Sequence, residues 1–199
     1  MIRRMKRRRR TWVKGAVRVP GRDPGVMDGN GGTRKVTIHT EAPRGGTRGK
    51  YGRDGNAITL ARYVAGANTG YHLVYDYSGC IAQLYKPRQG SRALLVPPGA
   101  SWSPNRQGDV NIQLCFAGIT DAADVAHWPM KNWDRLLAYF DAWGIPRDAI
   151  TDFHHPTRSE RHWRRSGWTC HAAAPMNDHQ DGRGLPIKRL LNWDRRGGR

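Results

Sequence analysis

Short apolar runs rich in β-branched residues are spread along this chain and separated by turn-forming residues. Residues 36–39 predict a buried strand. Residues 72–76 and 81–85, with the turn residues 78–79 between them, predict a β-hairpin. Residues 110–116 predict a further strand, which Gly118 ends. The chain must therefore build at least one sheet from strands that are distant in sequence.

Helical spacing of apolar residues alternates with these strands. It occurs over residues 58–64, over residues 133–143 ahead of Gly144 and Pro146, and over a short segment at 186–193. At 199 residues the chain is long enough for one ordinary domain. The order of elements predicts a single α/β domain with a central mixed β-sheet flanked by helices.

The N-terminal segment has a different composition. Seven of the first ten residues are basic, and residues 1–34 are rich in glycine and proline with little apolar periodicity. We therefore expect a basic, flexible N-terminal arm over 1–34 and the folded domain over 35–199. No long apolar stretch follows the basic run, so we expect neither a signal peptide nor a membrane span.

The net charge points to polyanionic surroundings. Lys and Arg number 34 against 16 Asp and Glu, which gives +18. Such an excess suits nucleic acid, an anionic cell wall or a membrane surface, and charge alone does not choose among them. The cysteines, Cys80, Cys115 and Cys170, form no CxxC pair, which excludes a thiolate-rich zinc finger.

The histidines suggest a different kind of site. A hydrolytic zinc centre needs three nitrogen or oxygen ligands and an open position for water. His39 ends a predicted strand, and one loop carries His171, Asp178, His179 and Asp181. A single strand-end histidine is more often structural, and a loop of this composition is more often a solvated turn. Only their combination favours a metal site.

Several segments resemble a known family, the zinc-dependent N-acetylmuramoyl-L-alanine amidases, which include phage endolysins and peptidoglycan recognition proteins. The closing segment is similar to the H…PxNDHxDPG form of actinobacteriophage lysins. The similar segments, in chain order, are WVKGAVR at 12–18, VTIHT at 36–40, GYHLVYDYSG at 70–79, GASW at 99–102, the strand within 110–118, and the segment 171–182.

The resemblance implies a set of roles in the active site. His39, His171 and Asp181 would bind Zn²⁺. Tyr71 matches the catalytic tyrosine of the family, and His179 lies where relatives carry a residue that stabilises the transition state.

The resemblance also implies substrate contacts by Trp102, Asn111 and Asn177. His72 follows Tyr71 directly, and successive side chains of a strand point to opposite faces. We therefore expect His72 to be structural.

The chain departs from the family pattern at four points, one of which is Ser103 in place of the histidine that usually follows the AW turn. The proline that follows the third ligand is replaced by Gly182. His179 occupies the position of a cysteine ligand in some relatives, so His179 rather than Asp181 could be the third ligand. Other branches use a glutamate in the central strand, where this chain has Gln113 and Cys115.

The resemblance implies a peptidoglycan hydrolase, an endolysin that cleaves the amide bond between N-acetylmuramic acid and L-alanine. Its partners would be bacterial peptidoglycan and anionic wall polymers, with no role for nucleic acid. We expect a monomer that accumulates in the host cytoplasm before lysis and then acts on the wall. Two alternatives stay open: a basic nucleic-acid-binding protein, and a relative that binds peptidoglycan without cleaving it.

Overall fold

A computed structural model describes residues 10–41, 53–67, 69–94, 96–119 and 121–193. These residues form one six-stranded sheet with the strand order β1-β4-β3-β5-β2-β6. Only the β3–β4 pair is antiparallel, and the other neighbours run parallel, so the sheet is mixed as expected. The strands are β1 (Val17–Arg18), β2 (Arg34–Glu41), β3 (Leu73–Tyr75), β4 (Ile81–Gln83), β5 (Val110–Ala117) and β6 (Gly167–Cys170).

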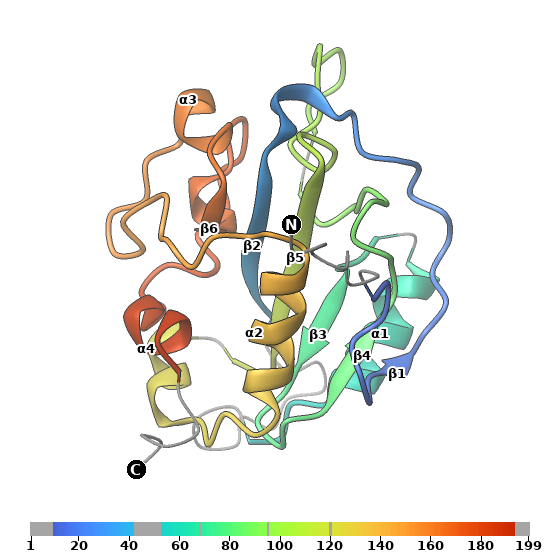
Figure 1. Cartoon of the computed structure of the whole chain (residues 1–199), viewed down its shortest axis with the longest axis vertical. Coiled ribbons are helices and arrows are strands. Elements are labelled where there is room, and N and C mark those ends of the chain that lie inside the picture. Colours follow the sequence, from blue (N-terminus) through green and yellow to red (C-terminus); the bar gives the residue numbers. More distant parts are fainter. Residues whose placement is uncertain (1–9, 42–52, 68, 95, 120, 194–199) are drawn as a thin grey trace, which may run out of the picture.

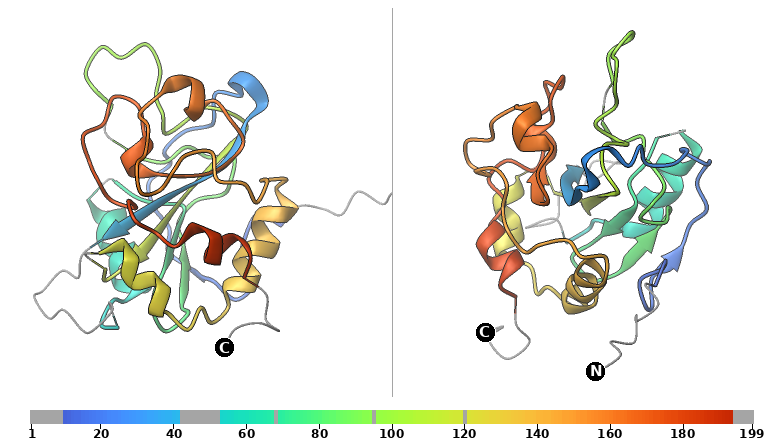
Figure 2. Two further views of the ribbon diagram at one scale, coloured as in Figure 1. Left: turned by 90° about the vertical axis from the view of Figure 1, so that its left-hand side faces the viewer. Right: turned by 45° about the horizontal axis from the view of Figure 1, so that its top comes forward.

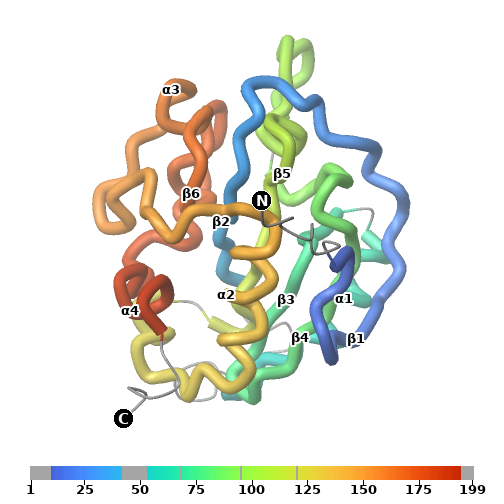
Figure 3. The backbone as a smooth tube through the Cα atoms, viewed as in Figure 1, coloured from blue at the N-terminus to red at the C-terminus, as the bar shows by residue number. Residues whose placement is uncertain are grey.

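Helices cover both faces of the sheet (Figure 1). The α2 helix packs on one face against the apolar side chains of β2 and β5. The α1 helix packs on the other face against β3, β4 and the end of β5. Figures 2 and 3 show α4 beside α2 and away from α1. The α-helices are α1 (Ala57–Gly66), α2 (Trp133–Ala142), α3 (Glu160–Trp163) and α4 (Ile187–Leu191), and the 3-10 turns are η1 (Asn30–Gly32), η3 (Ala122–His127) and η4 (His171–Ala173).

The strands and helices expected from periodicity are present, but the sequence pattern gave no sign of β6. β6 has only four residues, Gly167–Cys170, which is too short for an alternation of apolar and polar residues to be recognised. It also begins with a glycine whose φ is +132°. A β-carbon on Gly167 would lie 2.4 Å from the carbonyl oxygen of Asp148. The glycine therefore lets the strand approach a neighbouring loop, and tertiary contacts rather than local propensity define this strand.

Part of the predicted N-terminal arm packs on the domain. Val13 is buried and donates its backbone N–H to Gln83 Oε1 at 2.8 Å. Val17 and Arg18 form β1 at the sheet edge. Residues 1–9, which carry most of the basic run, lie outside the described residues.

Within the described part of the chain, no helix is both long enough and apolar enough to span a bilayer.

The two faces of β2 differ in chemistry because its side chains alternate. Val36 and Ile38 enter the apolar core under α2. Lys35, Thr37 and His39 point to the opposite face and are also buried. A buried polar row is costly unless its members are hydrogen-bonded, so this face is built for specific contacts.

Lys35 illustrates that cost. Its Nζ donates to Gln107 Oε1 at 2.6 Å and to the carbonyl oxygen of Trp163, and it lies 4.8 Å from the Trp163 ring centre. Burial lowers the pKa of Lys35 from 10.5 to about 7, although Asp28 acts in the opposite direction. Between these two values the unfolded chain binds a proton at residue 35 that the folded chain has lost.

Lys35 should therefore make stability depend on pH. Because the unfolded state holds more protons between pH 7 and 10.5, the free energy of unfolding should rise with pH, by up to about 1.4 kcal/mol per unit. Lys35→Met lacks this contribution. The free energy of unfolding of both proteins can be measured in urea at pH 7, 8 and 9. As pH rises, the value for wild type should increase relative to the value for Lys35→Met. A difference between the two values that is constant with pH would show that Lys35 stays charged in the fold.

Candidate metal centre

The sheet brings two histidines to the same edge. β2 and β6 run parallel, with Ile38 opposite Cys170. A histidine directly follows each of these two residues: His39 within β2, and His171 at the start of η4. Parallel strands end at the same edge, so His39 and His171 meet there. Their rings lie 4.6 Å apart between centres, and their Nδ1 atoms are separated by 3.1 Å.

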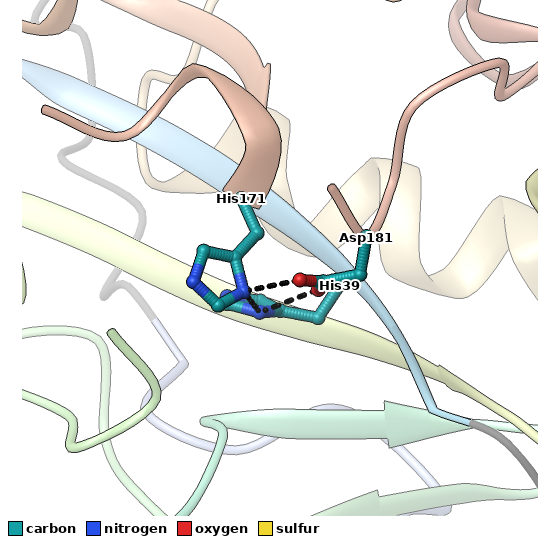
Figure 4. Close-up of side chains that lie close together, drawn as sticks. All are labelled: His39, His171 and Asp181. Carbon is teal, nitrogen blue, oxygen red and sulfur yellow. Dashed lines mark hydrogen bonds and ion pairs between the residues drawn. The ribbon is translucent and has the colours of Figure 1, made fainter. Parts of the chain in front are cut away.

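Asp181 completes a three-residue cluster (Figure 4). Its Oδ1 lies 2.6 Å from His171 Nδ1, and its Oδ2 lies 3.2 Å from His39 Nδ1. The three ligand atoms all lie within 4.8 Å of one another, and both histidines are buried. Two imidazoles and one carboxylate at this separation are a donor set that can hold a metal ion.

The protonation states also suit a metal. Burial lowers the pKa of His171 below its ordinary value, although Asp181 acts in the opposite direction. Burial alone would raise the pKa of Asp181, but the neighbouring imidazoles of His171 and His39 hold it well below its ordinary value. Metal binding requires neutral histidines and an ionised carboxylate, and these shifts favour a neutral His171 and an ionised Asp181.

Gln113 sets the orientation of His39. Its Oε1 lies 2.5 Å from His39 Nε2. An amide oxygen only accepts, so Nε2 carries the proton and the lone pair of a neutral ring lies on Nδ1, facing the cluster. A hydrogen-bond partner of this kind fixes the tautomer with which a histidine can bind a metal.

Gly182 explains why the proline of the family motif is missing. Its φ is +79°, which proline cannot adopt because its ring holds φ near about −65°. A β-carbon at this position would lie 2.8 Å from both the Ile38 carbonyl oxygen and Cys170 Cβ. The Gly182 N–H donates to Thr40 Oγ1 at 3.3 Å. Close packing on β2, rather than a rigid ring, holds the turn that presents Asp181.

Tyr71 lies beside the cluster. Its ring centre is 4.9 Å from that of His39, and its hydroxyl donates to Glu41 Oε2 at 3.0 Å. Burial is the main reason that the pKa of Tyr71 lies well above its ordinary value, with Cys115 and Glu41 adding to the effect. The hydroxyl therefore stays protonated near neutral pH.

His179 lies at the rim of the site rather than in the cluster. Its ring stacks on His171 with centres 4.8 Å apart, and its side chain is 58% exposed. Its Nδ1 is 4.0 Å from Asp181 Oδ1. The structure thus groups Asp181, and not His179, with the two histidines.

An open groove of about 590 Å³ adjoins the cluster. His171 and His179 form one side, and Arg92 and Arg106 contribute positive charge. The groove also includes Ser91, Leu94, Ser103 and Asn105. Such an opening can admit a polar or anionic ligand to the metal-binding atoms.

The three residues expected to contact substrate lie in different settings. Asn111 is fully buried, accepts from Thr37 Oγ1 and donates to the Pro104 carbonyl oxygen, so it supports the loop and does not line the groove. Trp102 is half-buried and donates its Nε1 to Glu160. Asn177 accepts the His179 backbone N–H at 3.0 Å and thereby shapes the closing loop.

His72 has the structural environment expected for it. It is buried, its Nε2 donates to the Gln89 carbonyl oxygen, and its Nδ1 accepts the Gln113 backbone N–H. Burial lowers its pKa to about 4. With both ring nitrogens bonded to backbone, His72 holds β3 and β5 together.

The sequence analysis did not single out Glu41, Arg92 or Arg106. Glu41 could have been found, because it lies two residues beyond His39 and so shares its face of the strand. The two arginines lie in a long irregular segment between β4 and β5, where no pattern fixes the side-chain direction.

Comparisons with known proteins support the fold. No protein-family model matches the chain, and no curated protein matches it significantly. The Staphylococcus aureus hydrolase AmiA, solved with its ligand, matches 90% of this chain and 81% of its own, with 12% identity and a TM-score of 0.56. A selenomethionine derivative of AmpD matches 91% of this chain and 96% of its own, with 16% identity and a TM-score of 0.52.

A third similar structure is LysCS, an endolysin N-acetylmuramoyl-L-alanine amidase from Clostridium intestinale. It matches 90% of this chain and 95% of its own at 13% identity, with a TM-score of 0.46, which is too low to argue from. The first two likenesses establish the α/β fold of this chain, a mixed sheet with helices in one domain.

Gly182→Ala should distort the site, and Gly184→Ala provides a matched control. Both glycines have positive φ, +79° and +82°, but a β-carbon on Gly184 would meet nothing within 4 Å. We expect Gly184→Ala to lower the free energy of unfolding by about 1 kcal/mol, and Gly182→Ala by about 3 kcal/mol, since it adds a backbone clash. Only Gly182→Ala should also weaken metal binding, at least about tenfold. Urea unfolding and chelator competition measure the two effects, and equal results for both variants would refute this account of Gly182.

Proposed function

We propose that this protein is a zinc-dependent N-acetylmuramoyl-L-alanine amidase that hydrolyses the bond between the lactyl group of N-acetylmuramic acid and L-alanine in peptidoglycan. The observation that carries the proposal is the convergence of His39, His171 and Asp181 beside an open groove. The sequence resemblance assigns these same residues as ligands. The fold shared with the hydrolase AmiA adds support.

The donor set fits zinc better than a hard cation. Two imidazole nitrogens and one carboxylate are typical of catalytic zinc, whereas Mg²⁺ and Ca²⁺ prefer all-oxygen sets. When bound, zinc lowers the pKa of water and polarises a carbonyl group. Gln113 supports this use because it directs the His39 lone pair into the cluster.

Groups of the chain itself supply the remaining chemistry. Tyr71 presents a neutral hydroxyl next to His39, in a position to contact the attacking water. His179 stands at the groove with an exposed ring, and there it can donate a proton to the departing amine of L-alanine or hydrogen-bond the developing oxyanion. Arg92 and Arg106 give the groove a charge that suits the carboxylates of the stem peptide.

The proposal includes an endolysin role, in which the protein leaves the host cytoplasm and acts on the bacterial wall. The net charge of +18 favours approach to a wall that carries anionic polymers. Long-range attraction of this kind raises the local concentration of enzyme at the wall and needs no specific contact.

Metal content should separate the two candidates for the third ligand. Asp181→Ala should lose bound zinc, because its carboxylate lies between the two histidines. His179→Ala should keep zinc but slow hydrolysis about 10²-fold, the loss expected for one positioned catalytic group. His154→Ala, in an exposed loop, is the control and should change neither. A zinc-free His179→Ala protein together with a zinc-loaded Asp181→Ala protein would reverse the assignment.

Cleavage of a soluble muropeptide tests the reaction itself. Mass spectrometry of the digest should show free N-acetylmuramic acid-containing glycan and a peptide with a new L-alanine N-terminus. His39→Ala and His171→Ala should abolish this product, and so should removal of metal from the wild-type protein by a chelator. Addition of zinc to the chelator-treated wild type should restore the product. A zinc-loaded wild type that binds the muropeptide and leaves it intact would favour a recognition protein. A protein without zinc that binds DNA at physiological salt would favour the nucleic-acid alternative.

A further inference from the structure

Glu41 lies next to the proposed reaction centre. The sequence resemblance assigns it no role, and it is not one of the three candidate metal ligands. It is the last residue of β2, two residues beyond His39 and on the same face of the strand. The chain has only two glutamates, and the other, Glu160, bonds Trp102 Nε1. Other branches of the resembling family have a glutamate in the central strand. In this chain, Gln113 and Cys115 occupy that region of β5.

The main chain holds Glu41 rigidly. Its carbonyl oxygen accepts the N–H groups of Gly118 at 2.7 Å and Ile119 at 3.1 Å, where the chain leaves β5. Gly55 packs against the Ala117 carbonyl group from the other side, where a β-carbon would lie 2.2 Å from the oxygen. The end of β2 is therefore fixed, and the Glu41 carboxylate projects from a defined point.

The carboxylate is directed at Tyr71. Tyr71 Oη donates to Glu41 Oε2 at 3.0 Å, while the Tyr71 ring lies against His39. Tyr71 and Cys115 also lie close enough for each to influence the pKa of the other. A thiol is a weak acceptor and a carboxylate a strong one, so the phenolic proton lies toward Glu41.

This direction decides what Tyr71 can offer to a reactant. A phenol has one proton to donate and two lone pairs with which to accept. Because the hydroxyl donates its one proton in the hydrogen bond to Glu41, only a lone pair of Tyr71 is left for the reaction centre. Such an oxygen can accept a hydrogen bond from the attacking water, but it cannot donate one to a developing oxyanion.

We propose that Glu41 is a positioning residue that fixes the direction of the Tyr71 hydroxyl, an inference that rests on the proposed amidase function. Tyr71 then orients the attacking water by accepting a hydrogen bond from it. Oxyanion stabilisation is then left to other groups, such as the imidazole of His179 at the groove. Glu41 contributes to the rate only through Tyr71.

A double-mutant cycle tests this dependence. The proteins are wild type, Glu41→Ala, Glu41→Gln, Tyr71→Phe and the double variant Glu41→Ala with Tyr71→Phe, each measured for zinc content, kcat and KM on a soluble muropeptide. Tyr75→Phe is the matched control, because it removes a buried hydroxyl that bonds the Lys131 carbonyl oxygen away from the site.

The expected pattern is specific. Glu41→Ala should lower kcat about 10- to 100-fold with zinc content unchanged and KM within about twofold. Glu41→Gln keeps a side-chain oxygen that accepts the phenolic proton, so it should recover most of the rate. In the Tyr71→Phe background, Glu41→Ala should cost nothing further. Tyr75→Phe should retain the wild-type kcat.

Three results would overturn the inference: loss of zinc in Glu41→Ala, a Glu41→Gln variant as slow as Glu41→Ala, or an equal cost of Glu41→Ala with and without the Tyr71 hydroxyl. If Tyr71→Phe is too slow to measure, the glutamine variant decides alone. A zinc-loaded wild type that does not cleave the muropeptide would instead refute the proposed function, so the two failures are distinguishable.

Discussion

In the parallel ladder between β2 and β6, Ile38 lies opposite Cys170. The residue after each of them is a histidine of the candidate metal site. This pairing joins segments that are 132 residues apart in the chain. β5 pairs with the other side of β2, which places Gln113 against His39 and Cys115 near Tyr71. The positions of His39, His171 and Gln113 therefore follow from where three parallel strands lie relative to one another. Irregular segments add Asp181, Tyr71, His179 and the groove.

On the face of the sheet that carries the site, the side chains of β2 and of the first half of β5 are polar. Thr37 bonds Asn111, Asn111 bonds the Pro104 carbonyl oxygen, and Lys35 bonds Gln107. These contacts attach the segment that forms the groove to β2 and β5. A metal at the cluster would add a further link between β2, β6 and the closing loop, and metal binding of this kind stabilises the folded state.

Periodicity was sufficient to predict the mixed α/β architecture, because the buried runs in β2 and β5 and the amphipathic α2 helix have strong patterns. The motif resemblance supplied His39, His171 and Asp181, whose proximity no spacing rule could establish. β6 escaped prediction because Gly167–Cys170 is short and is defined by contacts with β2 and a loop. The burial of Asn111 and the hydrogen bond between Glu41 and Tyr71 depend on side-chain directions across different strands, which a single sequence does not encode in any readable pattern.

Diffraction from crystals of the zinc-loaded protein, measured on both sides of the zinc absorption edge, tests the central claim most directly. The account predicts one anomalous peak between β2, β6 and the closing loop. That zinc should bind Nδ1 of His39 and of His171 at about 2.0–2.1 Å and a carboxylate oxygen of Asp181 at about 2.0–2.2 Å. A zinc ion bound through His179 in place of Asp181, or no peak at this cluster in a protein that contains zinc, would contradict it.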